Sequence, residues 1–392
     1  MTYTTPAKDG NATSAATTNG DAAAANGGEV TKKIMLTGGC VSEKGNEFLG
    51  EYFACLELTN KAYSFTPIPP KTQFQAWTGT FESLPDMPRE RARHNSFQLG
   101  NNLLCVIGGR DTSDTLIAPI DCYDATTNVW TEVGTLPDEY LTSDAAAYAS
   151  DNTVHLIGGY KQDYEALSQV TIVDMSDLTN IQFTKGVPID TPRGDINVVE
   201  VEDGSALMIS GGFTHLNDFS APLNSVEKFQ FDSQTWGPVD ALNEERGDKQ
   251  LINLNGKIYA MGGEGRVDAS GPVPDEALAA ITMGSIVLDT VEVLDLTAGK
   301  DGDEVEWKTQ GDMPSSLFRF GASGWNEEVI FVFGGQVGFE TECECFRTTE
   351  KVLVFDPKKS LDHQADTLSA GVAISVVVGH VVAVAAMVMM LA

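Results

Sequence analysis

Few side chains in this sequence combine into a set that could do chemistry. Of the five histidines, His94 and His155 fall in strand-like runs, and His215 is the one expected in a loop. Cys343 and Cys345 form a Cys-X-Cys pair with no third cysteine or histidine close by, which is a weak metal signal. We expect no metal and no cofactor.

The acidic and nucleophilic residues point the same way. Asp111 and Asp114 lie close together in the sequence, but they lack the ligand spacing of a calcium loop. No phosphate-binding loop, Gly-X-Ser-X-Gly elbow or His-Glu-X-X-His helix occurs. We therefore expect a protein that is not an enzyme.

Arginine is the most promising candidate for ligand binding. Four arginines follow turn residues at repeated points in the chain: Arg93, Arg193, Arg246 and Arg319. Guanidinium groups form charge-assisted hydrogen bonds with carboxylates, so a cluster of them suits an acidic peptide or a sugar acid. The other candidate partners are neighbouring acidic loops, which would make the arginines structural. The elements that position them decide whether they can act together.

Those elements repeat. A Gly-Gly doublet ends a short apolar run six times, and the middle copies are about 50 residues apart. The doublets are Gly38-Gly39, Gly108-Gly109, Gly158-Gly159, Gly211-Gly212, Gly262-Gly263 and Gly334-Gly335. An aromatic residue follows most doublets in phase, namely Trp77, Trp130, Phe183, Trp236 and Trp307.

With these doublets and phased tryptophans, residues 30–355 resemble the kelch-repeat β-propeller family. The resemblance implies an all-β ring of four-stranded blades, a to d from the channel outward. It does not fix a function, because the family includes adaptors, scaffolds and some enzymes. The ligands of the copper radical oxidases, an enzyme type on this scaffold, cannot be assembled from this sequence.

Six doublets predict six blades, with a degenerate seventh as an alternative. The first copy has no strand a before Ile34, and the last has no tryptophan strand after Phe355, so the closure of the ring is left open. The b–c and d–a loops must emerge on one face, where long loops concentrate binding residues. The four arginines would begin the inner strands there, around the channel mouth.

The ends of the chain differ in composition. Residues 1–29 are rich in Ala, Thr, Asn and Gly and predict a disordered arm, followed by the propeller at 30–357 and a polar linker at 358–367. Residues 368–392 carry no Asp, Glu, Lys or Arg and predict a transmembrane helix or a lipid-anchor signal. A buried strand pair that helps close the ring is the alternative. Without a secretory signal, a cytosol-facing tail anchor is favoured, and a glycolipid anchor follows if the N-terminus is misassigned.

The cysteines leave the compartment open. Cys40 and Cys55, and likewise Cys105 and Cys122, could each meet across a hairpin. Free buried thiols are the alternative for Cys105 and Cys122.

Charge narrows the range of partners. A net charge of −31 repels phosphate backbones, so we expect no nucleic-acid ligand. We expect a membrane-tethered kelch propeller that binds a protein partner through its b–c and d–a loop face. The alternative is a carbohydrate-active enzyme or a carbohydrate-binding protein that uses the same face.

Overall fold

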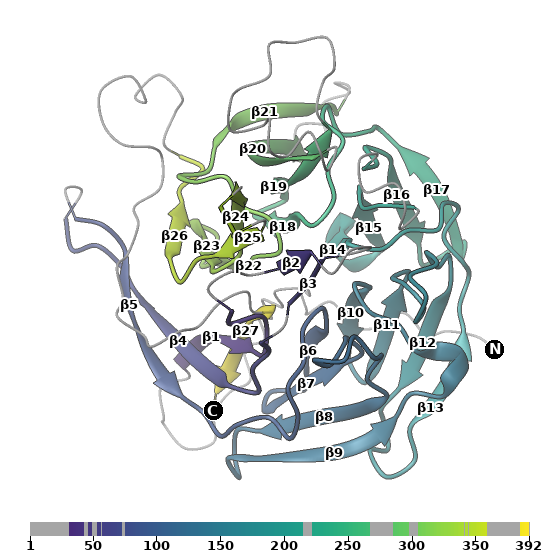
Figure 1. Ribbon diagram of the computed structural model, residues 1–392. Helices are drawn as coiled ribbons and strands as arrows, with labels where there is room; N and C mark the ends of the chain where they lie inside the picture. The colour runs from purple at the N-terminus through teal and green to yellow at the C-terminus, as the bar shows by residue number, and fades with distance from the viewer. Residues whose placement is uncertain are drawn as a thin grey trace.

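The computed structural model describes the propeller and one segment near the C-terminus (Figure 1). The described residues are 31–42, 46–48, 53–55, 57–72, 75–214, 222–266, 285–297, 305–340, 342–343, 345–358 and 385–391. The expected disordered arm (1–29) and most of the expected linker and tail lie outside this part of the chain. So does His215.

Six antiparallel sheets form the blades of a ring, which confirms the six-bladed prediction. Four blades are complete runs of consecutive strands. Blade 2 contains β6 (Asn95–Leu99), β7 (Leu103–Ile107), β8 (Pro119–Asp124) and β9 (Val129–Thr135). Blade 3 contains β10 (Ala146–Ser150), β11 (Thr153–Ile157), β12 (Val170–Asp174) and β13 (Gln182–Lys185). Blade 4 contains β14 (Asn197–Val201), β15 (Ala206–Ser210), β16 (Val226–Gln230) and β17 (Thr235–Val239). Blade 5 contains β18 (Gln250–Leu254), β19 (Lys257–Arg266), β20 (Ser285–Asp295) and β21 (Trp307–Asp312).

The remaining two blades meet where the ring closes. Blade 6 has three described strands, β22 (Gly321–Trp325), β23 (Val329–Phe333) and β26 (Val352–Phe355). Blade 1 has β1 (Thr31–Thr37), β4 (Ala62–Ile68) and β5 (Thr78–Ser83), and its innermost strand is β27 (Ala385–Leu391). β27 runs antiparallel to β1 and contacts both β22 and β6. The C-terminal segment therefore supplies the strand that the first repeat lacks.

β27 bears directly on the expected membrane helix. The structure does not show that helix, because the described part of residues 368–392 is a strand in blade 1. Within the described residues, no helix has the length and apolar character to span a bilayer. β27 consists only of Ala, Met, Val and Leu, a composition that suits a strand packed between neighbouring blades as well as a membrane span. Composition alone cannot separate the two structures.

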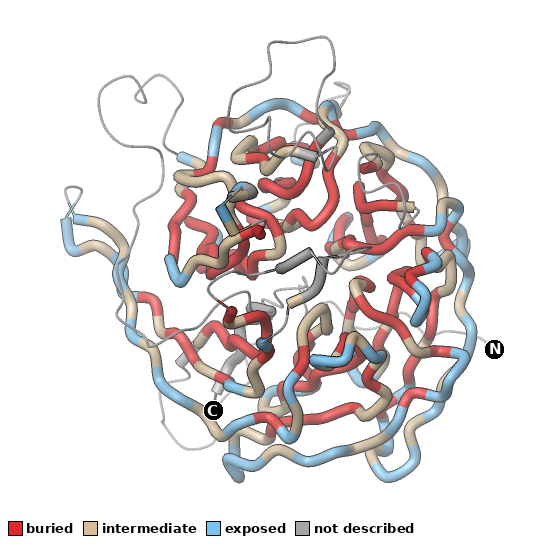
Figure 2. Tube along the Cα trace, in the orientation of Figure 1, coloured by how far each residue is buried: buried red, intermediate tan, exposed pale blue. Residues whose placement is uncertain are grey.

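Burial falls from the channel to the rim (Figure 2). Every residue of β15 and β23 is buried, whereas the outer strands β5 and β9 alternate between exposed and half-buried positions. Apolar side chains of adjacent blades pack face to face. At the closure, Phe65 of blade 1 packs against Phe331 and Phe333 of blade 6, with ring centroids 5.4 and 5.3 Å apart. The core is therefore a set of layers between blades.

The glycine doublets allow adjacent blades to approach closely. In all six copies both glycines have positive φ, a conformation that glycine adopts without strain. The N–H of Gly212 donates to the carbonyl of Arg246 in the next blade, at 2.9 Å. A Cβ added to Gly211 would lie 2.2 Å from the same oxygen. The repeat glycines are thus fixed by both conformation and space.

The phased aromatic residues tie each outer strand to the blade before it. The indole N–H of Trp130 donates to Pro85 O at 2.8 Å, that of Trp236 to Val187 O at 3.0 Å, and that of Trp307 to Asp240 O at 3.0 Å. In blade 3, Phe183 instead stacks on Tyr140 of the short 3-10 turn Asp138–Tyr140. A second such turn spans Glu202–Gly204. These aromatic residues therefore link neighbouring sheets.

A further small sheet lies over the channel on the loop face (Figure 1). It joins the b–c connections of blades 6 and 1. Its strands, in order, are β24 (Gln336–Glu340), β25 (Cys345–Thr348), β2 (Asn46–Phe48) and β3 (Phe53–Cys55). We call it the accessory sheet. Because it pairs the last blade with the first, it is a second device that closes the ring.

Candidate functional site

Five charged residues stand at equivalent positions around the channel mouth. Each lies two residues before the innermost strand of its blade, and each has φ between 51° and 57°. We call them the charged ring: Arg93, Asp144, Asp195, Asp248 and Arg319. Backbone hydrogen bonds of 2.9 to 3.3 Å link each residue to the next, from Asp144 N–H to Arg93 O through to Arg319 N–H to Asp248 O. The backbone therefore fixes where these side chains begin.

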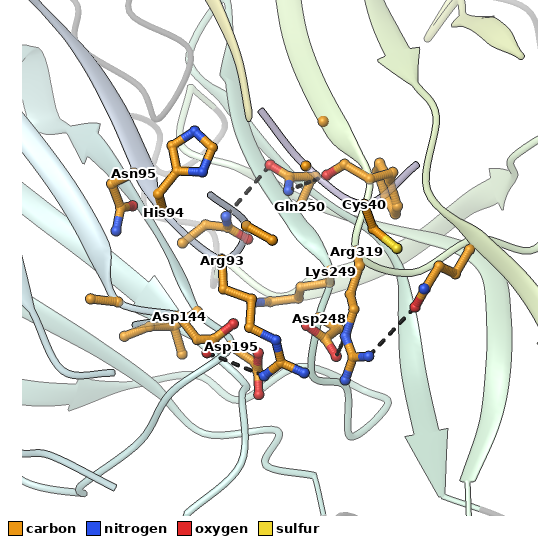
Figure 3. A pocket seen from close by; sticks show the side chains of 18 of the residues that line it. Cys40, Arg93, His94, Asn95, Asp144, Asp195, Asp248, Lys249, Gln250 and Arg319 are labelled. Atoms are coloured by element: carbon orange, nitrogen blue, oxygen red, sulfur yellow. Dashed lines mark hydrogen bonds and ion pairs between the residues drawn. The ribbon is translucent and has the colours of Figure 1, made fainter. Parts of the chain in front are cut away.

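The charges of the ring pair with one another (Figure 3). The Arg93 guanidinium lies 3.3 Å from Asp144, and that of Arg319 lies 2.8 Å from Asp248. Asp195 stands between the two pairs, and its Oδ2 accepts a 2.9 Å hydrogen bond from the Tyr160 hydroxyl. The third carboxyl of the ring thus has no arginine of its own.

Burial and charge together set the protonation of the ring. Burial, reinforced by Asp248 and Asp144, raises the pKa of Asp195 well above its usual value. Burial also opposes ionisation of Asp248, but the Arg319 and Arg93 guanidiniums and hydrogen bonds with Asp195 and Glu264 together outweigh it and lower the pKa of Asp248. The raised pKa favours the protonated form of Asp195, the one aspartate of the ring that forms no ion pair with Arg93 or Arg319.

A cavity of about 180 Å³ opens at the ring. Its wall continues below the ring into the amide side chains of Asn95, Asn197 and Gln250, which begin three of the inner strands. On the side of blade 1, Gly39, Cys40 and Cys55 complete the wall. The site is therefore polar and concave.

The expected cluster of four arginines does not form. Arg93 and Arg319 are at the mouth, but Arg193 and Arg246 are fully buried and do not line the cavity. Arg193 donates to Gly211 O at 3.0 Å and to the Glu227 carboxylate at 2.6 Å. In blade 5, Arg246 binds Gly262 O and Glu292 in the same way.

The position of each arginine within its repeat explains why some are buried and others lie at the channel mouth. Arg91, and not Arg93, is the equivalent of Arg193 and Arg246, since it binds Gly108 O and Asp121. The structural arginine always has an acid on the adjacent c strand. Blade 3 has neither, because Thr142 and Thr171 occupy the two positions. This covariation within the repeats is the sequence signal that separates structural arginines from those of the ring.

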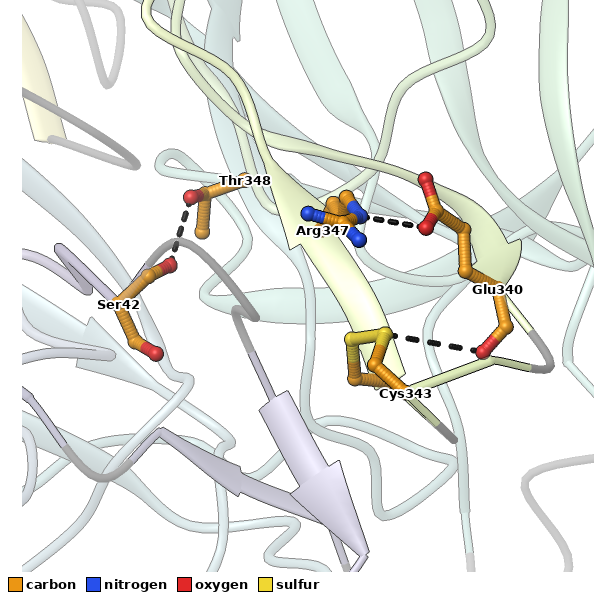
Figure 4. Close-up of a disulfide and its surroundings, with 6 residues drawn as sticks. Ser42, Glu340, Cys343, Arg347 and Thr348 are labelled. Atoms are coloured by element: carbon orange, nitrogen blue, oxygen red, sulfur yellow. Dashed lines mark hydrogen bonds and ion pairs between the residues drawn. A yellow bond between two sulfur atoms is a disulfide. The ribbon is translucent and has the colours of Figure 1, made fainter.

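The cysteines are all paired. Disulfides join Cys40 to Cys55, Cys105 to Cys122 and Cys343 to Cys345. The first two are the pairs expected across hairpins. The third lies in the accessory sheet, near the Arg347–Glu340 ion pair and the hydrogen bond from the Thr348 hydroxyl to Ser42 O (Figure 4).

Other candidates are held by local contacts. The Asp111 carboxylate accepts from the N–H groups of Ser113 and Thr115 in its own loop, and Asp114 binds the hydroxyl of Tyr164. Across the described residues, no three His, Cys, Asp or Glu side chains come together in a way that could hold a metal ion.

The b–c loops of blades 2 and 3 interlock beside the ring. The Arg110 guanidinium donates to Lys161 O at 2.6 Å and to Ser143 Oγ at 2.9 Å, and it lies over the Tyr164 ring at 3.7 Å. Gln162 donates to Asp114 O at 2.8 Å. Two loops from different blades therefore form one rigid surface.

Comparisons with known proteins agree with this architecture. Kelch-like protein 41b of Danio rerio is 25% identical over 49% of this chain and 30% of its own length. Kelch-like protein 35 of Mus musculus is 24% identical over 68% of this chain and 46% of its own. The chain thus spans less than half the length of these relatives. No protein-family model matches it.

A solved structure shows the same fold. The protein described as "Structure of YjhT" superimposes with a TM-score of 0.58 at 11% identity, over 82% of this chain and 96% of that one. At this identity the likeness concerns the fold alone. Six phased glycine doublets, the six-bladed ring and these relatives together support a place for the chain in the kelch-repeat β-propeller family.

Proposed function

We propose that this propeller is a non-catalytic module that binds a protein partner through the face formed by its b–c and d–a loops. The observation that carries the proposal is the interlocked pair of loops in blades 2 and 3 beside the charged ring. A surface ordered before binding loses less entropy when a partner docks, so rigid loops favour recognition. The kelch-like relatives support the same kind of role.

The partner must suit a face that presents both signs of charge. The ring arginines are already paired with aspartates, and the exposed Lys161 pairs with Glu165 at 2.7 Å. A partner segment carrying both acidic and basic residues matches this pattern better than a purely acidic one. Such complementarity sets specificity and association rate more than affinity.

Capture with matched charge reversals tests the proposal. The full chain serves as bait, with Lys161→Glu on the loop face and Lys308→Glu on the exposed rim strand β21 as the control. We expect partners of the wild type to be retained by Lys308→Glu and lost by Lys161→Glu. Equal capture by both variants contradicts the proposed face.

An enzyme or carbohydrate binder on the same face is the competing function. The polar cavity is the observation that favours it. Turnover of a glycoside or sugar acid by the purified chain, abolished by substitution of a ring residue, would replace the non-catalytic proposal. The capture experiment is independent of that result.

The disulfides bear on the compartment. Cysteines that are all paired are typical of secreted and extracellular proteins, since the cytosol keeps thiols reduced. We therefore propose that the propeller faces an oxidising compartment. This departs from the cytosol-facing anchor that the sequence favoured.

Membrane attachment through the tail is a further proposal, supported by the uncharged run of residues 368–392. Residues 385–391 cannot be in the bilayer and in blade 1 at once, so a tethered chain must leave the edge of β1 to another strand. Extraction of membranes with carbonate distinguishes a membrane-inserted tail from a tail that forms the closing strand. Retention of the full chain in the membrane pellet and release by deletion of 368–392 support the tether. Recovery of the full chain in the supernatant, with unfolding after the deletion, favours the closing strand.

A further inference from the structure

The wall of the cavity contains buried polar atoms without partners among the described residues. They are Asp195 Oδ1, Asn197 Oδ1 and Ser96 Oγ. Asp195 and Ser96 are each 6% exposed. A buried polar atom left without a hydrogen bond costs roughly 1–3 kcal/mol, so such atoms are normally satisfied. Three of them around one cavity indicate a site built for a polar occupant.

The amide side chains below the ring extend this pattern. Asn197 Nδ2 lies 3.5 Å from Gln250 Oε1, and Gln250 Nε2 donates to Phe320 O at 2.6 Å. The three amide residues of this layer, Asn95, Asn197 and Gln250, carry no charge. Each amide offers both donors and an acceptor, and the matching group on a ligand is the hydroxyl, which also donates and accepts.

The paired charges of the ring disfavour both an anion and a cation as the ligand. An anion in the cavity would approach Asp144 and Asp248, and a cation would approach Arg93 and Arg319. Each ring charge is already compensated within the protein. Burial raises the pKa of Asp195, which favours the protonated carboxyl, the form that can donate a hydrogen bond. A neutral ligand disturbs none of these pairs.

The volume of the cavity limits the size of the ligand. A cavity of about 180 Å³ has room for several water molecules, each of which takes roughly 30 Å³ in the liquid, or for one small organic molecule. The nearby Cys40–Cys55 disulfide fixes the wall on the side of blade 1. A polymer could enter only by one terminal unit.

We propose that the channel mouth binds one small, uncharged, polyhydroxylated molecule of the monosaccharide or cyclitol class. Its hydroxyls meet Asp195 Oδ1, Ser96 Oγ and the amides of Asn95 and Asn197. The site develops the carbohydrate-binding alternative, and it does not depend on the partner face. It requires no catalysis.

Ligand-observed NMR and calorimetry on the full chain test the site. The neutral probes are glucose, galactose, mannose and myo-inositol, and the charged comparators are glucuronate and glucosamine. We expect at least one neutral probe to bind with a Kd of about 1 mM or tighter, and the comparators to bind about tenfold more weakly. Failure of every neutral probe to bind in that range overturns the proposal.

Matched asparagine variants locate the binding. Asn197→Ala should weaken the bound probe about fivefold to tenfold, whereas Asn152→Ala, in the a–b turn on the opposite face, should leave it unchanged. Asn95→Ala serves as a second variant should Asn197→Ala melt early. Equal affinity in all folded variants overturns the assignment. So does preferential binding of glucuronate that Arg93→Gln removes, which would make the ligand acidic.

The two proposals fail separately. Loss of probe binding with partner capture intact overturns only this site. Equal capture by Lys161→Glu and Lys308→Glu, with probe binding intact, overturns only the partner face.

Discussion

Replacing the buried Arg193 by alanine provides a sharp test of how the blades are held. Its guanidinium is fully buried and binds Gly211 O, Ser225 O and the Glu227 carboxylate, which is itself 3% exposed. Alanine leaves that carboxylate buried with only the backbone N–H groups of Asp190 and Thr191 as partners. Breaking a buried pair from one side costs about 3–5 kcal/mol.

The expected fall in melting temperature follows from the size of the ring. An unfolding entropy of about 2.1 cal/mol/K per residue over the roughly 290 described residues gives about 0.6 kcal/mol/K. The variant should therefore melt about 5–8 °C lower. Thermal unfolding followed by circular dichroism measures this directly.

Two controls separate the buried pair from general effects. Arg347→Ala removes a half-exposed partner of Glu340 and should cost at most about 1 kcal/mol. Replacing Arg193 and Glu227 together by leucine should recover part of the loss, because no unpaired charge remains. An Arg193→Ala protein that melts within about 1 °C of the wild type would refute the structural role.

Three further predictions concern the repeat, the ring and the disulfides. Gly211→Ala should destabilise the fold far more than Gly100→Ala. Both glycines have positive φ, but a Cβ at Gly211 would lie 2.2 Å from the carbonyl oxygen of Arg246, whereas a Cβ at Gly100 would meet open space. Equal unfolding free energies of the two variants would contradict this. Asp195→Asn should be more stable than the wild type at pH 8 and similarly stable below about pH 4. An acid whose pKa is raised in the folded state loses its stabilising contribution as pH rises, by about 1.4 kcal/mol per pKa unit of elevation. Parallel pH profiles of the unfolding free energy for the two proteins would disprove this. Replacing both Cys40 and Cys55 by serine opens a loop with a sequence separation of 15. The unfolding free energy measured with denaturant should fall by about 3 kcal/mol. An unchanged unfolding free energy would show that the wild-type disulfide does not stabilise the fold.

The repeat made the architecture predictable. The six glycine doublets and phased aromatics reflect contacts that recur in every blade, such as Gly212 N–H to Arg246 O and Trp236 Nε1 to Val187 O. Repetition let one pattern be read several times, so the six blades and four-strand order could be predicted. The position of the b–c loops at the channel face could be predicted from the four antiparallel strands of each blade alone.

The site was harder to predict, because its members share position and charge but not residue type. Arg93 and Asp144 are equivalent, yet one is basic and the other acidic. The sequence around Arg91 and Arg93 offers two arginines, and only their different contacts show which is structural. The accessory sheet joins residues 46–55 to 336–348, a pairing that no local pattern announces.

The tail was ambiguous for a physical reason. A strand covered on both faces and a helix in a bilayer both exclude charge. Residues 385–391 satisfy either environment, and the missing strand a of blade 1 was the one hint of where they belong.

Site-specific photo-crosslinking tests the central claim, that partners dock on the loop face, most directly. A photoreactive residue is placed at Thr112, in the exposed b–c loop of blade 2, or at Lys308 on the rim strand β21. We predict one partner band that forms from position 112 in the full chain and not from position 308. Crosslinks from position 308 alone, or equally from both positions, would contradict the claim.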